Sequence, residues 1–236
     1  MESQVFYRGP SMLDGAPILG IVKFGSSNKK TGKMSQTYII PDSDSQPNET
    51  LHDGRDASVC GDCPMRYDYD ENGDHIPGTR KCYVVMFRGP NSMWKHHRNK
   101  PVISPVEFGE MVTASGAPLR LGAYGEPVAI PMEVWEPAIH ATIINRTGFT
   151  GYTHQWRDFQ FQEWSKYLMA SIHDAGEVTE AEAMKWRYFR SSTDGHIPGK
   201  EVRCPAPDKG TKCIDCQLCQ GNERIGAKSV YIDIHK

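Results

Sequence analysis

An α/β fold is expected for this chain, with a mostly parallel sheet arranged as a partial or full (β/α) barrel. Short apolar runs recur along the sequence, and helical stretches separate them. Strand, helix and strand in this order indicate right-handed crossovers between parallel strands. With 236 residues, 38% of them apolar, the chain is long enough for one sizeable core. We therefore expect a single α/β domain over residues 1–236, with a cysteine-rich insertion at about 57–82 and a cysteine-rich metal-binding segment at about 203–236.

Each expected strand is an apolar run that turn residues bound on both sides. The expected strands are Ile18–Phe24, Gln36–Ile40, Cys82–Phe87, Leu119–Ala123, Phe149–Thr153, Tyr167–Ser171, Tyr188–Ser191 and Val230–Ile234.

The expected helices carry start signals in the sequence. Ser104–Glu107 has the pattern of a capping box with proline at the first helical position. Thr179–Glu182 repeats the Thr-x-x-Glu pattern, which predicts a helix that starts there. A third helix is expected over Pro131–Ile139, kinked or shortened by Pro137.

The charge and composition limit the class of protein. A net charge of −2 and a pI near 6.5 exclude a chain that binds nucleic acid through bulk positive charge alone. No apolar run approaches the roughly 20 residues that span a bilayer, and the first residues lack the pattern of a secretory signal. We therefore expect no membrane partner and a reducing, cytoplasmic location, where closely spaced cysteines are metal-binding or catalytic rather than disulfide-bonded.

Four cysteines near the C-terminus have the spacing C-x8-C-x2-C-x2-C. A C-x2-C turn brings two thiolates to one metal, so Cys204, Cys213, Cys216 and Cys219 are expected to hold zinc or an iron–sulfur cluster. The Cys-Pro pair that begins the group favours a ferredoxin-type [4Fe-4S] cluster. Zinc held by the last three cysteines and His235 is the alternative.

A second cysteine group lies in the insertion and contains Cys60, Cys63 and Cys82. His75 completes a zinc site in one interpretation. In another, the three cysteines hold a cluster with one iron open to a substrate, or one of them joins the C-terminal group. The structural alternative is a zinc knuckle that holds the loop together.

Polar side chains follow four consecutive expected strands, at the edge where parallel α/β sheets bind their ligands. Carboxylates and histidines there are suited to acid–base or nucleophilic catalysis, and an arginine to an anion. Structural alternatives are a helix cap for Asp158 and a polar loop for Asp174. The candidate catalytic residues are Glu126, His154, Asp158, His173 and Asp174, and the candidate substrate contacts are Tyr124 and Arg190.

Two basic stretches indicate a nucleic-acid partner. Ser26–Lys33 follows an expected strand without matching a nucleotide-binding P-loop. Trp94–Arg98 places basic residues beside an aromatic ring, as in sites that combine stacking with phosphate contacts. Both stretches are otherwise ordinary solvated surface. The candidate contacts are Lys29, Lys30, Lys95 and Arg98.

From about Lys23 onward the chain resembles a family of phage- and mobile-element-encoded proteins. The segments that carry this resemblance are SSNKKTGKMSQTYIIP, DASVCGDCP, KCYV, LRLGAYGEP, TGYTHQWR, WRYFRS and a closing CP…CxxCxxC. The resemblance implies a phage-type protein that works in the cytoplasm of a bacterial host.

The late cysteines also resemble the zinc site of tRNA-guanine transglycosylases and of their phage relatives that place 7-deazaguanine in DNA. Cys213, Cys216, Cys219 and His235 have a similar order, although those enzymes use C-x-C-x2-C. This resemblance implies a zinc-containing DNA-modifying enzyme on a barrel, in which a carboxylate at the strand ends displaces guanine and a second one positions the 7-deazaguanine base. The nucleic acid would be DNA rather than tRNA. This base exchange is our first hypothesis.

Two further hypotheses complete the set. Cys60, Cys63 and Cys82 followed by four late cysteines are similar in distribution to radical S-adenosylmethionine barrels, and Gly125–Pro127 is similar to their methionine-binding G-G-E segment. The C-x3-C-x2-C signature of that group is absent. This resemblance implies an iron–sulfur enzyme that uses S-adenosylmethionine. The last hypothesis is a zinc-stabilised nucleic-acid-binding protein without catalysis.

Overall fold

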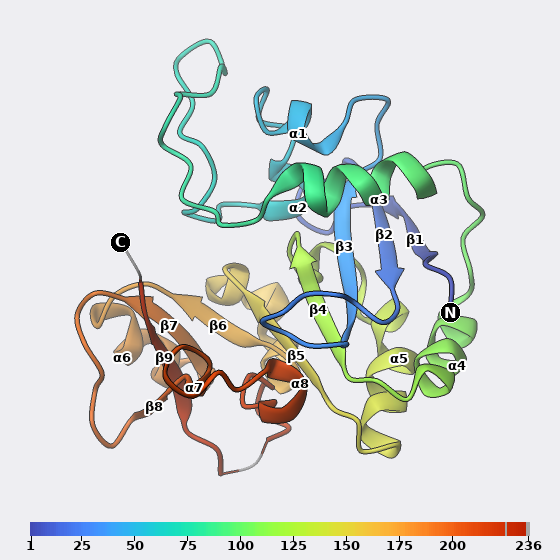
Figure 1. Cartoon of the computed structure of the whole chain (residues 1–236). Helices are drawn as coiled ribbons and strands as arrows, with labels where there is room; N and C mark the ends of the chain where they lie inside the picture. Colours follow the sequence, from blue (N-terminus) through green and yellow to red (C-terminus); the bar gives the residue numbers. More distant parts are fainter. Residues whose placement is uncertain (225, 235–236) are drawn as a thin grey trace.

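The chain forms one sheet of nine strands with helices around it (Figure 1). The computed structural model describes residues 1–224 and 226–234. The spatial order is β1-β2-β3-β4-β5-β6-β7-β9-β8. The strands are β1 (Gln4–Pro10), β2 (Pro17–Lys23), β3 (Ser35–Pro41), β4 (Leu119–Tyr124), β5 (Phe149–Thr153), β6 (Met169–Ile172), β7 (Tyr188–Ser192), β8 (Glu201–Arg203) and β9 (Ser229–Asp233).

The sheet is mostly parallel and open. Strands β1, β2 and β3 pair antiparallel, whereas every pairing from β3 onward is parallel. Within the described ranges the outer strands β1 and β8 do not pair with each other. The α/β class and the mostly parallel sheet are therefore confirmed, but the strands do not close into a full barrel.

Every expected strand except Cys82–Phe87 overlaps an observed one. That segment is a loop that ends in a single 3-10 turn, and Tyr83 and Phe87 are 80% and 69% exposed. An apolar run of strand-forming residues forms a strand only when a neighbouring strand completes its hydrogen bonds, and this run has no such neighbour. The expected set also lacked β1 and the short β8.

Short helices connect and cover the strands. The α-helices are α1 (Pro47–Thr50), α2 (Ala57–Cys60), α3 (Pro90–His97), α4 (Pro105–Ser115), α5 (Met132–Ile144), α6 (Gly176–Ala183), α7 (Pro205–Lys209) and α8 (Cys213–Cys216). The 3-10 helices are η1 (Met86–Arg88), η2 (Pro127–Ala129), η3 (Gln155–Arg157) and η4 (Phe159–Lys166). No helix in the described residues is long and apolar enough to cross a membrane.

The helix start signals were accurate at one position and wrong at another. The capping box of α4 is present, because the hydroxyl of Ser104 accepts from the amide of Glu107 and the carboxylate of Glu107 accepts from the amide of Ser104. Helix α6 begins at Gly176 rather than near Thr179, and Asp174 accepts a 3.0 Å hydrogen bond from the amide of Glu177. Helix α5 continues through Pro137 to Ile144, five residues beyond the expected end.

Burial alternates along β7, whereas β5 and β6 are buried except at one position each. In β7 the side chains of Tyr188 and Arg190 are buried, whereas Phe189 between them is half-exposed. In β5 and β6 the half-exposed positions are Tyr152 and Ser171. We call this half-exposed side, which carries Arg120, Tyr152, Ser171 and Phe189, the open face of the sheet.

Candidate functional site

The cysteine-rich insertion folds back over the carboxyl ends of β4 and β5. The amide of Glu126, which follows β4, donates a 2.6 Å hydrogen bond to the carbonyl of Val59 in α2. The side-chain amide of Gln155, which follows β5, donates to the carbonyl of Cys60 at 3.3 Å. The contact is close, because a Cβ atom at Gly61 would lie 2.5 Å from the amide nitrogen of Gln155. The first cysteine group therefore lies at the edge of the sheet where ligands bind in parallel α/β folds.

Glu126 sets the direction of the His154 ring. Its buried carboxylate lies 2.8 Å from Nδ1 of His154 and also accepts from the backbone amide of His154 at 3.1 and 3.2 Å. A carboxylate on Nδ1 fixes the orientation of an imidazole and leaves Nε2 available for another partner.

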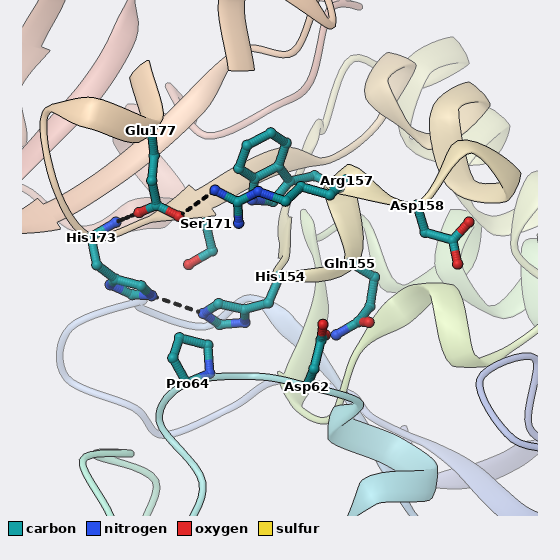
Figure 2. Close-up of a pocket in the computed structure, with 10 residues that line it drawn as sticks. Asp62, Pro64, His154, Gln155, Arg157, Asp158, Ser171, His173 and Glu177 are labelled. Atoms are coloured by element: carbon teal, nitrogen blue, oxygen red, sulfur yellow. Dashed lines mark hydrogen bonds and ion pairs between the residues drawn. The ribbon is translucent and has the colours of Figure 1, made fainter. Parts of the chain in front are cut away.

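Nε2 of His154 faces two further atoms that can bind a metal. It lies 3.8 Å from Sγ of Cys63 and 3.2 Å from Nε2 of His173. Nδ1 of His173 lies 3.0 Å from the hydroxyl of Ser191, so the second ring is also held from behind. Figure 2 shows the two imidazoles pointing toward each other beside Pro64. A thiol and two imidazole nitrogens thus come together from three separate parts of the chain.

These spacings resemble those around a tetrahedral metal. Metal–nitrogen bonds of about 2.0–2.1 Å and metal–sulfur bonds of about 2.3 Å would put two nitrogens about 3.3 Å apart and a sulfur and a nitrogen about 3.6 Å apart. The described residues nevertheless contain no group of three or more Cys, His, Asp or Glu side chains arranged as a complete site for one metal ion.

The two histidines differ in their protonation. Burial acts to lower the pKa of His154, but the hydrogen bonds to Cys63 and Glu126 outweigh burial and raise this pKa to about 10. Burial lowers the pKa of His173, and the nearby charge of His154 acts in the same direction. The hydrogen bond between the two Nε2 atoms therefore runs from a charged His154 to a neutral His173 when no metal is bound.

The remaining residues of the first cysteine group have different surroundings. Burial raises the pKa of the Cys60 thiol well above its usual value, and the charges of Asp56, Cys63 and Cys82 act in the same direction. The three thiols are therefore within range of one another's charges. His75 instead stacks on His52, with ring centroids 4.3 Å apart. The imidazole that faces a thiol of this group is therefore that of His154.

A pocket of about 290 Å³ adjoins the two histidines. On its wall Arg157 forms ion pairs with Glu177 and Glu180, at 2.9 and 2.8 Å. The pocket is therefore polar, and its charged groups are partly neutralised. It is lined by Asp62, Pro64, His154, Gln155, Trp156, Arg157, Asp158, Ser171, His173 and Glu177 (Figure 2).

The other candidate residues that follow the strands have structural partners or lie apart from Cys63, His154 and His173. Asp158 lines the pocket, but its carboxylate caps η4 and accepts from Gln160 at 3.0 and 2.7 Å. Asp174 is exposed and caps α6. Arg190 is fully buried and pairs with Glu201 at 2.5 Å. Tyr124 is buried at the end of β4 without a partner for its hydroxyl.

The C-terminal cysteine segment lies near the starts of the parallel strands. The amide of Cys213 donates to the carbonyl of Lys30 before β3, and the amide of Gly151 in β5 donates to the carbonyl of Cys219. Arg187, just before β7, donates to the carbonyls of Leu218 and Gly221 at 3.1 and 3.0 Å. These contacts hold the segment at the end of the sheet away from His154.

The charges of the four C-terminal thiols also act on one another. Burial raises the pKa of Cys219 to about 12, a hydrogen bond from Tyr152 opposes this rise, and the charges of Cys204, Cys213 and Cys216 add to it. His235, the proposed alternative ligand, lies outside the described residues.

The two basic stretches lie at opposite ends of β3. Lys29 and Lys30 are exposed on the loop before this strand. On α3, Lys95 is exposed, whereas Arg98 stacks over Trp94 at 4.4 Å and pairs with Asp44 at 3.3 Å. Trp94 itself donates to the carbonyl of Ser43, just after β3. The described residues therefore do not join the four predicted contacts into one patch.

Comparisons with protein-family models, with curated proteins and with solved structures find no match to this chain. The function is therefore inferred from the site itself. Sequence patterns had singled out His154, His173 and Cys63 one by one but not their contact. The signal for the two histidines was their position directly after neighbouring parallel strands, whereas nothing local predicts that the insertion brings Cys63 to them.

Proposed function

We propose that the chain is an enzyme that holds an iron–sulfur cluster on Cys60, Cys63 and Cys82 and uses S-adenosylmethionine. The supporting observation is the order of segments at one edge of the sheet. The cysteine insertion follows β3, the first strand of the parallel series, and packs on the Gly125–Pro127 segment that follows β4. Early cysteines and a Gly-Glu segment on adjoining parallel strands are the features in which the chain resembles radical S-adenosylmethionine barrels.

The donor set fits such a cluster. Three neighbouring thiols leave one iron of a [4Fe-4S] cluster without a protein thiolate. A cluster binds each thiolate through a different iron, so its ligands need not converge on one point. When bound, the cluster and S-adenosylmethionine supply one-electron chemistry. Zinc or a second cluster on the four C-terminal cysteines would be structural, because a site with four protein ligands is closed.

The residues around the thiols have their own part in the proposed reaction. Glu126 orients His154, and His154 places Nε2 between the thiol of Cys63 and the pocket. His154 can hold a proton there, and the neutral ring of His173, fixed by Ser191, accepts a hydrogen bond from it. The pocket beside the histidines gives a substrate access to this edge of the sheet.

A zinc centre is the second candidate, because the separations among Cys63, His154 and His173 are close to tetrahedral values. Three protein ligands would leave the fourth position open for an activated water. Glu126 and Ser191 would then orient the two imidazoles from behind.

The exchange of guanine for 7-deazaguanine in DNA stays a prediction. Asp158 and Asp174 cap helices, and Glu126 is engaged by His154, so no carboxylate of the candidate set is left unengaged as a nucleophile. If base exchange is nevertheless the reaction, Asp158→Ala, Asp174→Ala and Glu126→Ala in turn should reveal the nucleophile as the variant that loses exchange in a labelled-base assay.

Anaerobic purification followed by metal analysis tests the proposal. We expect iron and sulfide, broad absorption near about 400 nm, and cleavage of S-adenosylmethionine when a one-electron reductant is added. The triple variant Cys60→Ser, Cys63→Ser, Cys82→Ser should lose cleavage. The variant with Ser at all four C-terminal cysteines is the matched control and should keep it.

A colourless protein would contradict the cluster. If that protein contained zinc that Cys63→Ser, His154→Ala and His173→Ala each removed, the zinc centre would be correct instead. Zinc that only the C-terminal cysteine variant removed would leave the first cysteine group without a metal and would contradict both candidates.

A further inference from the structure

Arg120 is a cation on the open face of the sheet without an acidic partner. In the register of β3 with β4, Gln36 is opposite Arg120, and the hydroxyl of Tyr38 donates to the side chain of Gln36 at 3.3 Å, so Tyr38 and Arg120 lie on one side of the sheet. Nε of Arg120 is buried and has no hydrogen-bond partner among the residues that the structure describes. Its Nη2 donates to the hydroxyl of Tyr83 at 3.2 Å.

The surroundings of Arg120 differ from those of Arg190, which is fully buried. Arg190 has the carboxylate of Glu201 at 2.5 Å. No carboxylate of the described residues lies within ion-pair distance of Arg120, and the groups whose charges act on it are Tyr83, Tyr152 and Cys213. Nη1 of Arg190 likewise has no hydrogen-bond partner among the described residues, but Glu201 neutralises that guanidinium, whereas no described carboxylate neutralises Arg120, so a bound anion would complete its site.

Aromatic rings flank Arg120 on the same face. Tyr38 of β3 and Tyr152 of β5 are half-exposed. The ring of Tyr152 lies 4.8 Å from that of Phe189 of β7 between centroids, and its hydroxyl hydrogen-bonds to Cys219. The other face of these strands is buried in the core. A face that keeps aromatic rings and a cation half-exposed presents the chemistry that binds planar anions, because guanidinium matches an oxyanion and tyrosine stacks on a flat ring.

We propose that the open face binds a planar, oxyanion-bearing ligand of the nucleotide class. Its phosphate or carboxylate would lie on Arg120, and its ring against Tyr38 and Tyr152. The hydroxyl of Tyr83, which accepts from Arg120, belongs to the residue after Cys82, and the thiol whose charge acts on Arg120 is that of Cys213, so the ligand would lie on this face between the two cysteine groups. This inference rests on the proposed function, because the ligand would be the substrate of that reaction.

The experiment is a calorimetric titration of the anaerobically purified full chain with three probes: deoxyguanosine 5′-monophosphate, deoxyguanosine and benzoate. We expect the monophosphate to bind about ten-fold or more tightly than the nucleoside, because charge-assisted hydrogen bonds are strong. Arg120→Gln should reduce the monophosphate to the affinity of the nucleoside. Arg146→Gln, at an exposed arginine in the turn before β5, is the matched control and should bind like the unaltered chain.

Benzoate distinguishes the two oxyanions, because Arg120-dependent binding of benzoate would show that a carboxylate is sufficient. Arg120→Lys keeps the charge without the planar fork and should bind the monophosphate with intermediate affinity. It also serves as the test variant if thermal unfolding shows that Arg120→Gln does not fold.

Two results would overturn the inference. One is the absence of binding by both anions. The other is unchanged binding in Arg120→Gln together with a loss of metal from the C-terminal cysteines, which would make Arg120 a counter-charge for those thiolates. A chain without a cluster that still binds the monophosphate through Arg120 would refute the proposed function and leave the anion site intact.

Discussion

One buried carboxylate, that of Glu126, determines how the candidate centre is organised. It takes hydrogen bonds from both the backbone and the ring of His154, so the ring can turn only one edge toward Cys63 and His173. From its position after an expected strand, Glu126 is one of several candidate catalytic carboxylates. Its contacts instead make it the residue that orients another donor.

Glu126→Ala should lower the free energy of unfolding by about 1–3 kcal/mol, because two groups of His154 lose their acceptor in a partly buried place. Urea denaturation measures this change. Glu133→Ala, at an exposed glutamate of α5, is the matched control and should stay within about 0.5 kcal/mol. Equal stabilities of the two variants would show that Glu126 does not hold His154.

Arg190→Met should lower the free energy of unfolding by about 3–5 kcal/mol, because it leaves the buried carboxylate of Glu201 without its cation. Arg203→Met removes an arginine whose partner Asp233 lies at 2.9 Å but whose side chain is 49% exposed. That control should cost less than about 1 kcal/mol. A cost for Arg190→Met as small as that of the control would revive Arg190 as a substrate contact.

Among the elements, helices α4 and α5 pack directly against each other. A Cβ atom at Gly109 of α4 would lie 2.9 Å from the carbonyl oxygen of Pro137 in α5. Pro137 does not end α5, although proline disfavours a helix interior. Because Gly109 has no side chain, α4 can approach the backbone of α5 closely at Pro137, so the glycine has a packing role.

Gly109→Ala should therefore destabilise the protein by about 1–3 kcal/mol, since overlap with a backbone carbonyl outweighs the higher helix propensity of alanine. Thermal unfolding compares this variant with Glu110→Ala, one exposed position further along α4. A rise in the melting temperature of Gly109→Ala would mean that the helices move apart freely.

At the scale of the whole molecule, the two cysteine groups lie toward opposite ends of the parallel strands. The insertion contacts residues that follow β4 and β5, whereas the C-terminal segment contacts residues that precede β3 and β7. Nothing in these contacts requires one group to complete the other. The hypothesis that a cysteine of the insertion joins the C-terminal group is therefore the least favoured of the original alternatives.

We expect the metal content of the two groups to be additive. The triple variant of the insertion and the quadruple variant of the C-terminal segment should each lose part of the bound metal, and the two losses should sum to the total in the unaltered chain. Elemental analysis of all three proteins makes the comparison. Complete loss in either variant alone would mean that one metal site requires both groups.

Local patterns in the chain were sufficient for the α/β class, most of the parallel strands and the cap of α4, because strand and helix periodicity and capping act over a few neighbouring residues. They were insufficient at Cys82–Phe87, where the sheet provides no partner strand, and at α6, where Asp174 caps the helix ahead of Thr179. Closure of the sheet depends on whether the outermost strands meet, which no local pattern encodes.

The candidate site follows the same division. Residue types and spacing identified the cysteines, Glu126, His154 and His173 as chemically important. That Cys63 meets His154 across 91 residues, while His75 turns to His52 and Arg190 to Glu201, depends on how the insertion and the strands pack. Spacing along the chain sets which donors are available, and packing between distant segments sets which of them come together.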